Sequence, residues 1–390
     1  MKVEDMVLKK IRDIPPSGIR KYFDLINEMK DVISLGIGEP DFTTPWGISE
    51  SGIYSLEKGH THYSSNAGLL RLREEIARYV KRKYHLEYEA KSQVLVTVGG
   101  SEGIDLALRA LVEPGDEVII PEPSFVAYQG CTKLTGATPV TINLRAEDQF
   151  KLTPALLEKA LTPRTKVVII PFPNNPTGAI MNKEELSALV SLLKDRDLIV
   201  ISDEIYAELT YKDEHVSIAS FEGMKDKTIV INGFSKAFAM TGWRLGYVCA
   251  HPDLIKAMTK IHQYAIMCAP TTAQYAAIEA LQNGDAAVCE MVKEYNRRRL
   301  VVVDGFRKIG LDCFEPLGAF YAFPSIKSTG LTSEEFCEKL LLAEKVLVVP
   351  GTAFGRVGEG FVRVSYASSM ENLFEALKRI ERFVKSINLP

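Results

Sequence analysis

From residue 94 onward, short apolar runs alternate along the chain with segments that have the periodicity of amphipathic helices. The apolar runs are rich in valine and isoleucine and do not alternate with polar residues, which is typical of parallel strands covered on both faces. We expect strands at 94–98, 117–120, 138–144, 166–171, 197–202, 228–231 and 245–250, with helices at 102–112, 125–133 and 183–195 between several of them. This alternation predicts a three-layer α/β/α domain with a mostly parallel sheet.

The pattern differs on both sides of this region. Before it, we expect an arm with helical turns at 7–14 and an amphipathic helix at 19–29, a broken apolar strand at 33–42 and a long helix at 69–84. After it, we expect helices at 271–282, 290–310 and 371–386 and short strands at 314–323, 346–349 and 361–366. The chain is thus predicted to comprise an N-terminal arm that joins the small domain (1–45), a large domain (46–275) and a small C-terminal α+β domain (276–390).

Length and composition agree with a two-domain globular enzyme. A chain of 390 residues exceeds what one core usually supports, and 46% hydrophobic and 25% charged residues are ordinary proportions. A net charge of −3 without long runs of one sign argues against a nucleic-acid partner. Six scattered cysteines without a CxxC pair predict reduced thiols, with no disulfide frame and no metal site. We see no signal peptide and no run of about 18 apolar residues, so we expect a cytoplasmic protein without a membrane partner.

Chemically useful side chains follow the predicted strands. Ligands of parallel sheets bind outside the carboxyl ends of the strands. A glycine turn at 99–102 opens a helix there and predicts a seat for a phosphate, since the first amides of a helix are free. Later strands are followed by an aromatic ring, an amide, a carboxylate and a phenol: Phe125, Asn175, Asp203 and Tyr206. Each alone has an ordinary explanation, such as a cap, a turn or core filling. Together they predict a site for a phosphorylated cofactor that forms an imine.

The lysine for such an imine is Lys236. It comes directly after a buried strand, where loss of solvent would lower its pKa. Ser235 and Arg244 lie on the same loop and could hold a phosphate beside it. A lone Ser-Lys pair usually lies on the surface. The other candidate residues that follow the predicted strands favour a functional lysine here. Arg363 is a further candidate, because the strand pattern turns it to the face opposite Val362 and Val364.

These residues occur in segments that resemble the class I/II aminotransferases, which are aspartate aminotransferase-like, pyridoxal-phosphate-dependent enzymes of fold type I. The matching segments are Leu-Gly-Ile-Gly-Glu-Pro-Asp-Phe at 35–42, Tyr-Ser-Ser-Asn-Ala-Gly at 63–68, Asn-Asn-Pro-Thr-Gly at 174–178, Ser-Asp-Glu-Ile-Tyr at 202–206, Asn-Gly-Phe-Ser-Lys-Ala-Phe-Ala-Met-Thr-Gly-Trp-Arg at 232–244 and Arg-Val-Ser-Tyr-Ala at 363–367. They keep the family's order over roughly residues 30 to 370.

The resemblance implies a role for each candidate around the cofactor pyridoxal 5′-phosphate. Lys236 would carry the cofactor as an imine and then move the substrate's proton, and Asp203 would pair with the pyridine nitrogen. Tyr206 and Asn175 would bond the ring's 3-oxygen, and Phe125 would stack on the ring.

The remaining candidates would hold the two anionic ends of the complex. The phosphate would be held by Gly100, Ser101 and Glu102 of the glycine turn, by Ser235 and Arg244, and by Tyr63 of a partner subunit. Arg363 would clamp the substrate's α-carboxylate, and Gly38 would close over it. A homodimer with sites at the interface follows if Tyr63 acts across it.

Three positions depart from the family's usual wording. Phe125 stands where many relatives have tryptophan, and Gly233-Phe234 before Ser235 lacks one hydroxyl of the phosphate motif. Ser101 stands where some members that favour acidic substrates carry lysine. The wording at 17–20 and 44–46 is closest to aromatic or N-acetyl-diaminopimelate-type members.

The predicted function is therefore transfer of the amino group of an aromatic, neutral or diaminopimelate-type L-amino acid to a 2-oxo acid such as 2-oxoglutarate, in a ping-pong mechanism of amino-acid biosynthesis. An aspartate aminotransferase and a pyridoxal-phosphate C–S lyase remain as alternatives, because the same residues support them. A transcription regulator is disfavoured, since no basic recognition helix precedes the resemblance. A nucleotide-binding protein is disfavoured because GxxxxGK[ST] and a helix-opening GxGxxG are absent.

Overall fold

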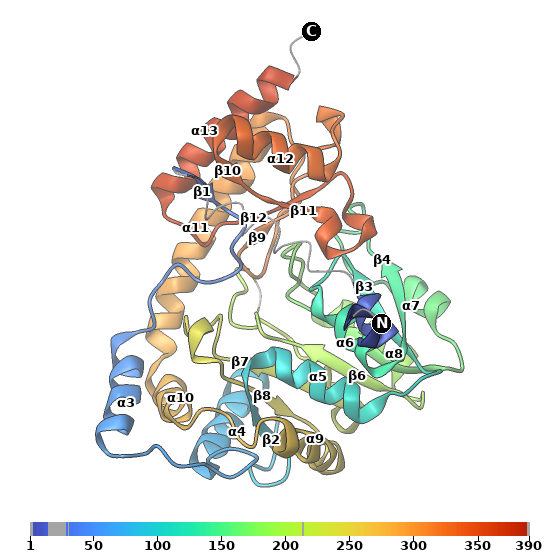
Figure 1. Cartoon of the computed structure of the whole chain (residues 1–390), viewed down its shortest axis with the longest axis vertical. Helices are drawn as coiled ribbons and strands as arrows, with labels where there is room; N and C mark the ends of the chain where they lie inside the picture. Colours follow the sequence, from blue (N-terminus) through green and yellow to red (C-terminus); the bar gives the residue numbers. More distant parts are fainter. Residues whose placement is uncertain (1–2, 15–28, 30, 213, 388–390) are drawn as a thin grey trace.

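The larger part of the molecule is built on one seven-stranded sheet (Figure 1). This computed structural model describes residues 3–14, 29, 31–212 and 214–387. The strands are β2 (Val94–Thr97), β3 (Glu117–Glu122), β4 (Thr138–Asn143), β5 (Thr165–Ile170), β6 (Ile199–Asp203), β7 (Thr228–Gly233) and β8 (Gly246–Cys249), in the order β2-β8-β7-β6-β5-β3-β4. Every strand predicted for this region is found, with ends shifted by one or two residues.

Only one strand of this sheet runs against the others. β8 pairs antiparallel with both β7 and β2, whereas the remaining pairs are parallel. The connection from β7 to β8 contains the 3₁₀ turn Thr241–Trp243 and no α-helix. Parallel neighbours are usually joined by a crossover helix, which this connection lacks. The predicted mostly parallel sheet is confirmed.

Helices cover both faces of the sheet. Val118 packs into a cluster with residues of α5 (Gly99–Leu111) and α9 (Pro252–Ala265), whereas its neighbour Ile119 packs with residues of α7 (Pro154–Ala160) and α8 (Lys183–Leu193). Successive residues of a strand point to opposite faces, so both faces are buried. This explains the unbroken Val/Ile runs and confirms the three-layer α/β fold.

The predicted helices are found with shifted ends: α4 (Leu70–Tyr84), α5, α6 (Ala127–Thr135), α8, α10 (Thr271–Asn283), α11 (Asp285–Ile309) and α13 (Met370–Ile387). The helical turns expected at 7–14 contain α1 (Lys9–Arg12), and the helix expected at 19–29 lies almost wholly outside the described residues. The sequence reading missed α3 (Trp46–Glu57), α7, α9 and α12 (Ser333–Glu344).

The C-terminal elements form a second group, at the top of Figure 1. β11 (Val349–Pro350), β12 (Val362–Ser365) and β9 (Tyr321–Ala322) make a three-stranded antiparallel sheet against α11, α12 and α13. The N-terminal strand β1 (Ile33–Ser34) reaches this group and pairs in parallel with β10 (Val346–Leu347). This pairing brings the segment after β1 to the side of β12.

The strand expected at 314–323 is wrong in length, because only Tyr321 and Ala322 are extended in a sheet. Pro316 cannot donate a ladder hydrogen bond, and Ala319 has φ 56°, in the left-handed region that breaks an extended run. The result is a tight bend directly before Tyr321. None of the described helices combines the length and apolar composition needed to cross a membrane.

Candidate active site

A cavity lies at the edge of the large sheet where its parallel strands end. It has a volume of about 490 Å³. β8 begins at this edge because it runs in the opposite direction, so the loop before it also reaches the cavity. The C-terminal group closes the other side. Eleven of the thirteen predicted site residues line it: Gly38, Gly100, Ser101, Phe125, Asn175, Asp203, Tyr206, Ser235, Lys236, Arg244 and Arg363.

Lys236 projects into this cavity from the loop after β7. Its Nζ donates a hydrogen bond of 2.6 Å to the carbonyl of Gly38 and lies 5.7 Å from the centre of the Tyr206 ring. Burial lowers the pKa of Lys236 to about 8, and the positive charges of Arg363 and Arg244 act in the same direction. The amine is therefore much more often neutral near pH 7 than that of an ordinary lysine.

Asp203 is the last residue of β6 and is buried. The hydroxyl of Tyr128 donates to its Oδ2 at 2.7 Å, and the amide of Ile205 donates to its Oδ1 at 3.2 Å. Burial raises the pKa of Asp203, against these two hydrogen bonds. Because both partners are neutral, this carboxylate can still accept a cation inside the cavity.

Arg363 reaches the cavity from β12 and is only 3% exposed. It donates from Nη1 to Asn175 Oδ1 at 2.9 Å and from Nη2 to the Gly36 carbonyl at 2.6 Å. Its Nε has no partner among the described residues. A guanidinium has five N–H donors, so three remain for an anion. The bond from Arg363 also leaves both amide hydrogens of Asn175 free.

The opposite end of the cavity is lined by groups suited to an anion. Gly100 and Ser101 lie in the first turn of α5, where backbone amides lack partners within the helix. Ser235 and Arg244 line the same cavity. Gly99 has φ 76°, and a Cβ there would meet Arg244 Nη2 at 2.6 Å, so only glycine lets the arginine lie this close.

Comparison with known proteins gives the family. The profile described as aminotransferase class I and II matches residues 30–380. A putative aminotransferase of Bacillus subtilis is 55% identical, over 96% of this chain and 97% of that protein. The chain belongs to the class I and II aminotransferases.

Relatives of this aminotransferase carry different substrate names. An aspartate aminotransferase of Pyrococcus abyssi is 47% identical over 96% of this chain and 97% of its own. The crystal structure of an aromatic aminotransferase from Pyrococcus horikoshii has a TM-score of 0.90 at 46% identity, covering 94% of this chain and 99% of that one. The protein is thus an enzyme that moves an amino group between amino acids and 2-oxo acids, and its cofactor is pyridoxal 5′-phosphate.

The described residues fit this cofactor. The buried, cation-free carboxylate of Asp203 matches a protonated pyridine nitrogen, and the weakly basic Lys236 matches an aldehyde carbon. The glycine turn beside Arg244 matches a phosphate. Phe125, half-buried and edge-to-face with Tyr128 at 5.8 Å, supplies an aromatic face to the cavity.

Two predicted residues do not line the cavity of the aminotransferase. The Glu102 side chain turns into the protein, where it accepts from the amide of Val98 at 2.5 Å and pairs with His262 Nδ1 at 2.7 Å. It holds the start of α5 and does not face the cavity. Tyr63 is 81% exposed on its own chain.

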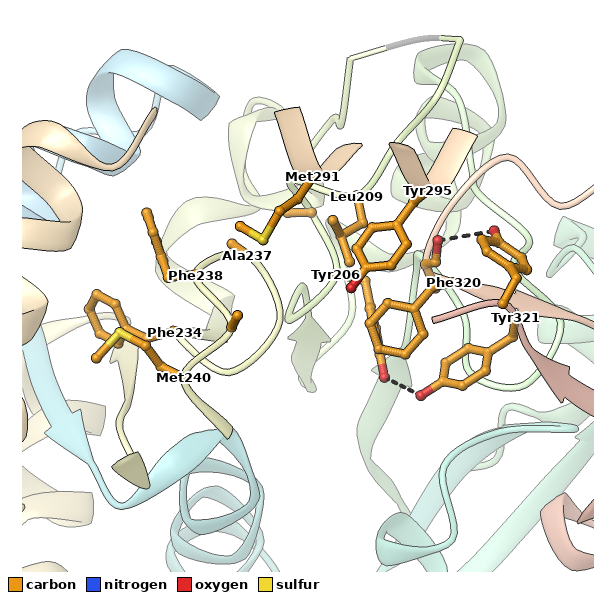
Figure 2. Packing of buried hydrophobic residues seen from close by; sticks show 14 of the residues in the cluster. Tyr206, Leu209, Phe234, Ala237, Phe238, Met240, Met291, Tyr295, Phe320 and Tyr321 are labelled. Carbon is orange, nitrogen blue, oxygen red and sulfur yellow. Dashed lines mark hydrogen bonds between the residues drawn. The ribbon is translucent and has the colours of Figure 1, made fainter. Parts of the chain in front are cut away.

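The cavity wall also contains residues that the sequence reading missed: Glu39, Ile104, Tyr128, Pro171, Pro173, Ile205, Thr241, Gly242 and Tyr321. Tyr128 is a buried residue of α6, three positions after Phe125 and without a motif of its own. Tyr321 follows the bend at Ala319 and has no motif around it. Figure 2 shows Tyr321 pointing at Tyr206, with a hydrogen bond between the two hydroxyls.

Proposed function

We propose that the enzyme transfers the amino group of an aromatic, neutral or diaminopimelate-type L-amino acid to a 2-oxo acid such as 2-oxoglutarate, by a ping-pong mechanism. The observation that carries this is the meeting of Lys236, Asp203 and Arg363 in one cavity of about 490 Å³. Together they offer a neutral amine, a carboxylate for a ring nitrogen and a clamp for an α-carboxylate. We further propose that it works in the cytoplasm, in amino-acid biosynthesis.

In this proposal Lys236 moves the proton. Its amine, with a pKa of about 8, would hold the cofactor covalently and, once released from it, would act as a base. As a base it would take the proton from the substrate's α-carbon and later give it back as an acid. When bound, pyridoxal phosphate supplies a ring that stabilises the negative charge left on the α-carbon.

Arg363 orients the substrate. Its remaining N–H groups bind the α-carboxylate in a bidentate manner, while Asn175 and the Gly36 carbonyl hold the guanidinium still. Gly38 covers the carboxylate with its backbone. A carboxylate held at this point presents the α-hydrogen to Lys236, which turns the proton transfer into a reaction between fixed neighbours.

The other end of the cofactor is held as an anion. Gly100, Ser101, Ser235 and Arg244 bind the phosphate, and Glu102 keeps the α5 turn in shape. Phe125 would supply a face for the ring, Asp203 would keep its nitrogen protonated, and Tyr206 and Asn175 would donate to its 3-oxygen. Burial raises the pKa of Tyr206 far above neutral pH, so its hydroxyl keeps the proton it must donate.

The cavity wall supports a donor with an uncharged side chain. One chain supplies three cations to the wall, Lys236, Arg244 and Arg363, and each already has a role. Four aromatic rings lie beside them, those of Phe125, Tyr128, Tyr206 and Tyr321. A side-chain carboxylate would find no fourth cation in the wall formed by the described residues of one chain. Aspartate is therefore the second candidate.

We also propose a homodimer in which Tyr63 binds the phosphate of the partner subunit. Its 81% exposure supports this, because the side chain has no place in its own cavity. The loop that carries it lies against the start of α10, where Thr271 Oγ1 donates to the His62 carbonyl at 2.8 Å. Exposed apolar residues lie near this loop, among them Tyr264 and Met267.

We further propose that the chain divides into an N-terminal arm (1–45) that joins the small domain, a large domain (46–275) and a small domain (276–390).

Replacing Lys236 tests the proposal. Lys236→Ala should abolish turnover and remove the covalently bound cofactor, as measured by rates and by absorption after denaturation. Lys256→Ala, which changes an exposed lysine of α9, is the control and should leave both unchanged. Near-normal turnover of Lys236→Ala would refute the assignment.

A further inference from the structure

Tyr321 contacts both halves of the active site. Its hydroxyl lies 2.7 Å from the hydroxyl of Tyr206, and the guanidinium carbon of Arg363 lies 4.6 Å from the centre of its ring. The side chain is fully buried and lines the cavity. One residue thus contacts the proposed donor to the cofactor's 3-oxygen and the proposed clamp of the substrate's carboxylate.

The direction of the hydrogen bond follows from the number of hydrogens. Each phenol carries one hydrogen, and burial raises the pKa of both, so both stay protonated. If Tyr206 donates its hydrogen to the cofactor, the 2.7 Å contact can only be a donation from Tyr321 to Tyr206. A phenol that accepts a hydrogen bond becomes a stronger donor, because bonds in a chain polarise one another.

The ring of Tyr321 acts on the other neighbour. Arg363 lies between two aromatic rings, that of Tyr321 at 4.6 Å and that of Phe354 at 4.7 Å. Contact with ring faces stabilises a guanidinium and restricts its rotation. The absence of a side chain at Gly38 makes room for the Tyr321 hydroxyl, because a Cβ at residue 38 would lie 2.7 Å from the hydroxyl oxygen.

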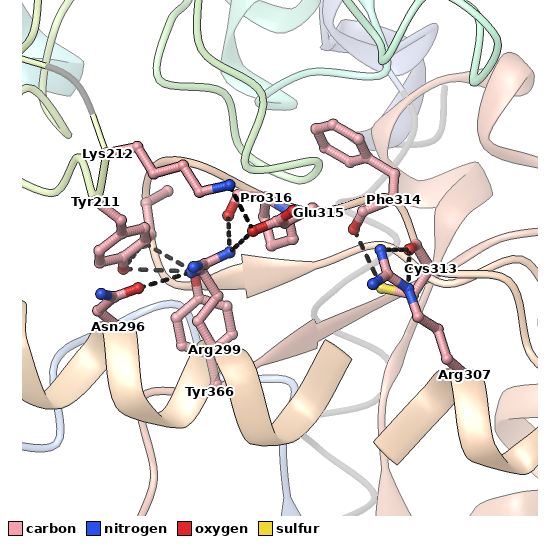
Figure 3. A network of polar contacts seen from close by, with 11 residues as sticks. Tyr211, Lys212, Asn296, Arg299, Arg307, Cys313, Phe314, Glu315, Pro316 and Tyr366 are labelled. Carbon is pink, nitrogen blue, oxygen red and sulfur yellow. Dashed lines mark hydrogen bonds and ion pairs between the residues drawn. The ribbon is translucent and has the colours of Figure 1, made fainter. Parts of the chain in front are cut away.

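The backbone before Tyr321 is held firmly from two sides (Figure 3). Arg299 of α11 donates to Glu315 Oε1 at 2.8 Å and to the Pro316 carbonyl at 3.2 Å, and Lys212 pairs with the same carboxylate at 3.1 Å. Tyr366 donates to the Ala319 carbonyl at 3.1 Å, and the Ala319 amide donates to the Leu209 carbonyl at 2.8 Å. The bend at Ala319 therefore delivers Tyr321 to one position.

We propose that Tyr321 is a positioning residue that strengthens the hydrogen bond of Tyr206 to the cofactor through its hydroxyl and aligns Arg363 for the substrate's carboxylate through its ring. This inference rests on the proposed function. The two roles of Tyr321 can be tested separately, because Tyr321→Phe removes the hydroxyl and keeps the ring.

The hydroxyl is tested in the holoenzyme by a pH titration of the cofactor's absorption band without substrate. A donor on the 3-oxygen lowers the pKa of the nitrogen that joins Lys236 to the cofactor, so a weaker donor raises it. Tyr321→Phe should raise this pKa by about half a unit. Tyr206→Phe should raise this pKa more. Adding Tyr321→Phe to Tyr206→Phe should not change the pKa further, because the Tyr206 hydroxyl through which Tyr321 acts is already absent.

The ring is tested by kinetics. Tyr321→Phe should leave KM for amino acid and 2-oxo acid within twofold, whereas Tyr321→Leu should raise both roughly 5- to 20-fold through loss of the contact with Arg363. Tyr295→Phe is the control, because it removes a buried hydroxyl that has no hydrogen-bond partner among the described residues, on a ring 5.5 Å from that of Phe320, and it should shift neither the band's pKa nor KM.

Two results would overturn the inference while leaving the proposed function intact. These are an unshifted band in Tyr321→Phe, or a shift that adds fully to that of Tyr206→Phe. Absence of the cofactor band from the unmodified protein, or its survival in Lys236→Ala, would instead overturn the proposed function and this inference with it.

Discussion

At the scale of single residues, Lys236 depends on burial for its reactivity. It lies in the loop after a fully buried strand, and among the residues that the structure describes its ammonium donates one hydrogen bond, to the Gly38 carbonyl. Removal from water destabilises the charged form, which lowers its pKa to about 8. At pH 7 roughly a tenth of the molecules carry a neutral amine, against fewer than about one in a thousand for an ordinary lysine.

This pKa predicts the pH dependence of cofactor capture. Only the neutral amine attacks the aldehyde, so capture of pyridoxal phosphate by the apoprotein should become about tenfold faster from pH 6 to pH 7 and level off above about 8. Stopped-flow absorption measures the rate. A rate that still rises steeply between about pH 9 and 10 would indicate an ordinary, solvated lysine and contradict the account.

Individual residues could be predicted from the sequence where the chain itself marks them. Asp203, Asn175 and Lys236 each follow an apolar run closely, so their place at the sheet edge follows from the strand pattern. Tyr321 could not be found in this way. Tyr321 lies 115 residues beyond Tyr206 and reaches the cavity because Arg299 and Tyr366 hold the bend at Ala319.

At the scale of elements, the turn between β2 and α5 determines how closely the phosphate groups can gather. Gly99→Ala would place a methyl group 2.6 Å from Arg244 Nη2 and force alanine to φ 76°. We expect the dissociation constant for pyridoxal phosphate to rise about tenfold or more, since a charge-assisted contact moves away.

Gly115→Ala separates strain from contact. Gly115 also has a positive φ, 107°, but a Cβ there would meet nothing within 4 Å. Both variants should lose about 1 kcal/mol of stability in thermal unfolding, because alanine is disfavoured in this conformation. Only Gly99→Ala should weaken cofactor binding in titrations. Equal affinities in the two variants would contradict a role for this turn in phosphate binding.

Helices and strands could be predicted where the hydrophobic residues follow one clear period. They were hard to predict where tertiary contacts determine the local structure. The strands of the large sheet are short segments that contain valine or isoleucine, and all seven could be predicted from this pattern. The antiparallel direction of β8 goes with a connection that lacks a crossover helix, and the apolar pattern of the strand itself does not encode this direction. Helix α3 exposes Trp46, Ile53 and Leu56 to solvent on this chain, so its apolar positions do not make the one-sided stripe of a surface helix.

At the scale of the whole molecule, these exposed residues support the proposed dimer. Trp46, Ile53 and Leu56 of α3 are 69%, 47% and 54% exposed, and Tyr264 and Met267 before α10 are 88% and 46% exposed. α3 packs on α10, and Asn66 donates to the Met267 carbonyl at 2.8 Å, so the residues share one region with the Tyr63 loop. Apolar surface of this extent is typical of an interface.

A charge in this surface should separate the subunits. Leu56→Glu is expected to convert dimers to monomers in sedimentation velocity, because a carboxylate would be buried in an apolar contact. It should also weaken cofactor binding, since Tyr63 of the partner is lost. Leu342→Glu, at a leucine of α12 that is 70% exposed, is the control and should remain dimeric. A wild-type protein that is monomeric yet fully active would contradict the proposal.

The central claim is that this site carries out half of a transamination with each substrate in turn. The most direct measurement is the visible absorption of the purified holoenzyme as single L-amino acids are added without any 2-oxo acid. The account predicts that the band of the cofactor's aldehyde form is replaced by that of its amine form, with one equivalent of 2-oxo acid released per site. Aromatic and neutral donors should convert it at lower concentrations than aspartate. A band that persists while pyruvate and ammonia or sulfide accumulate would contradict the account and indicate a lyase.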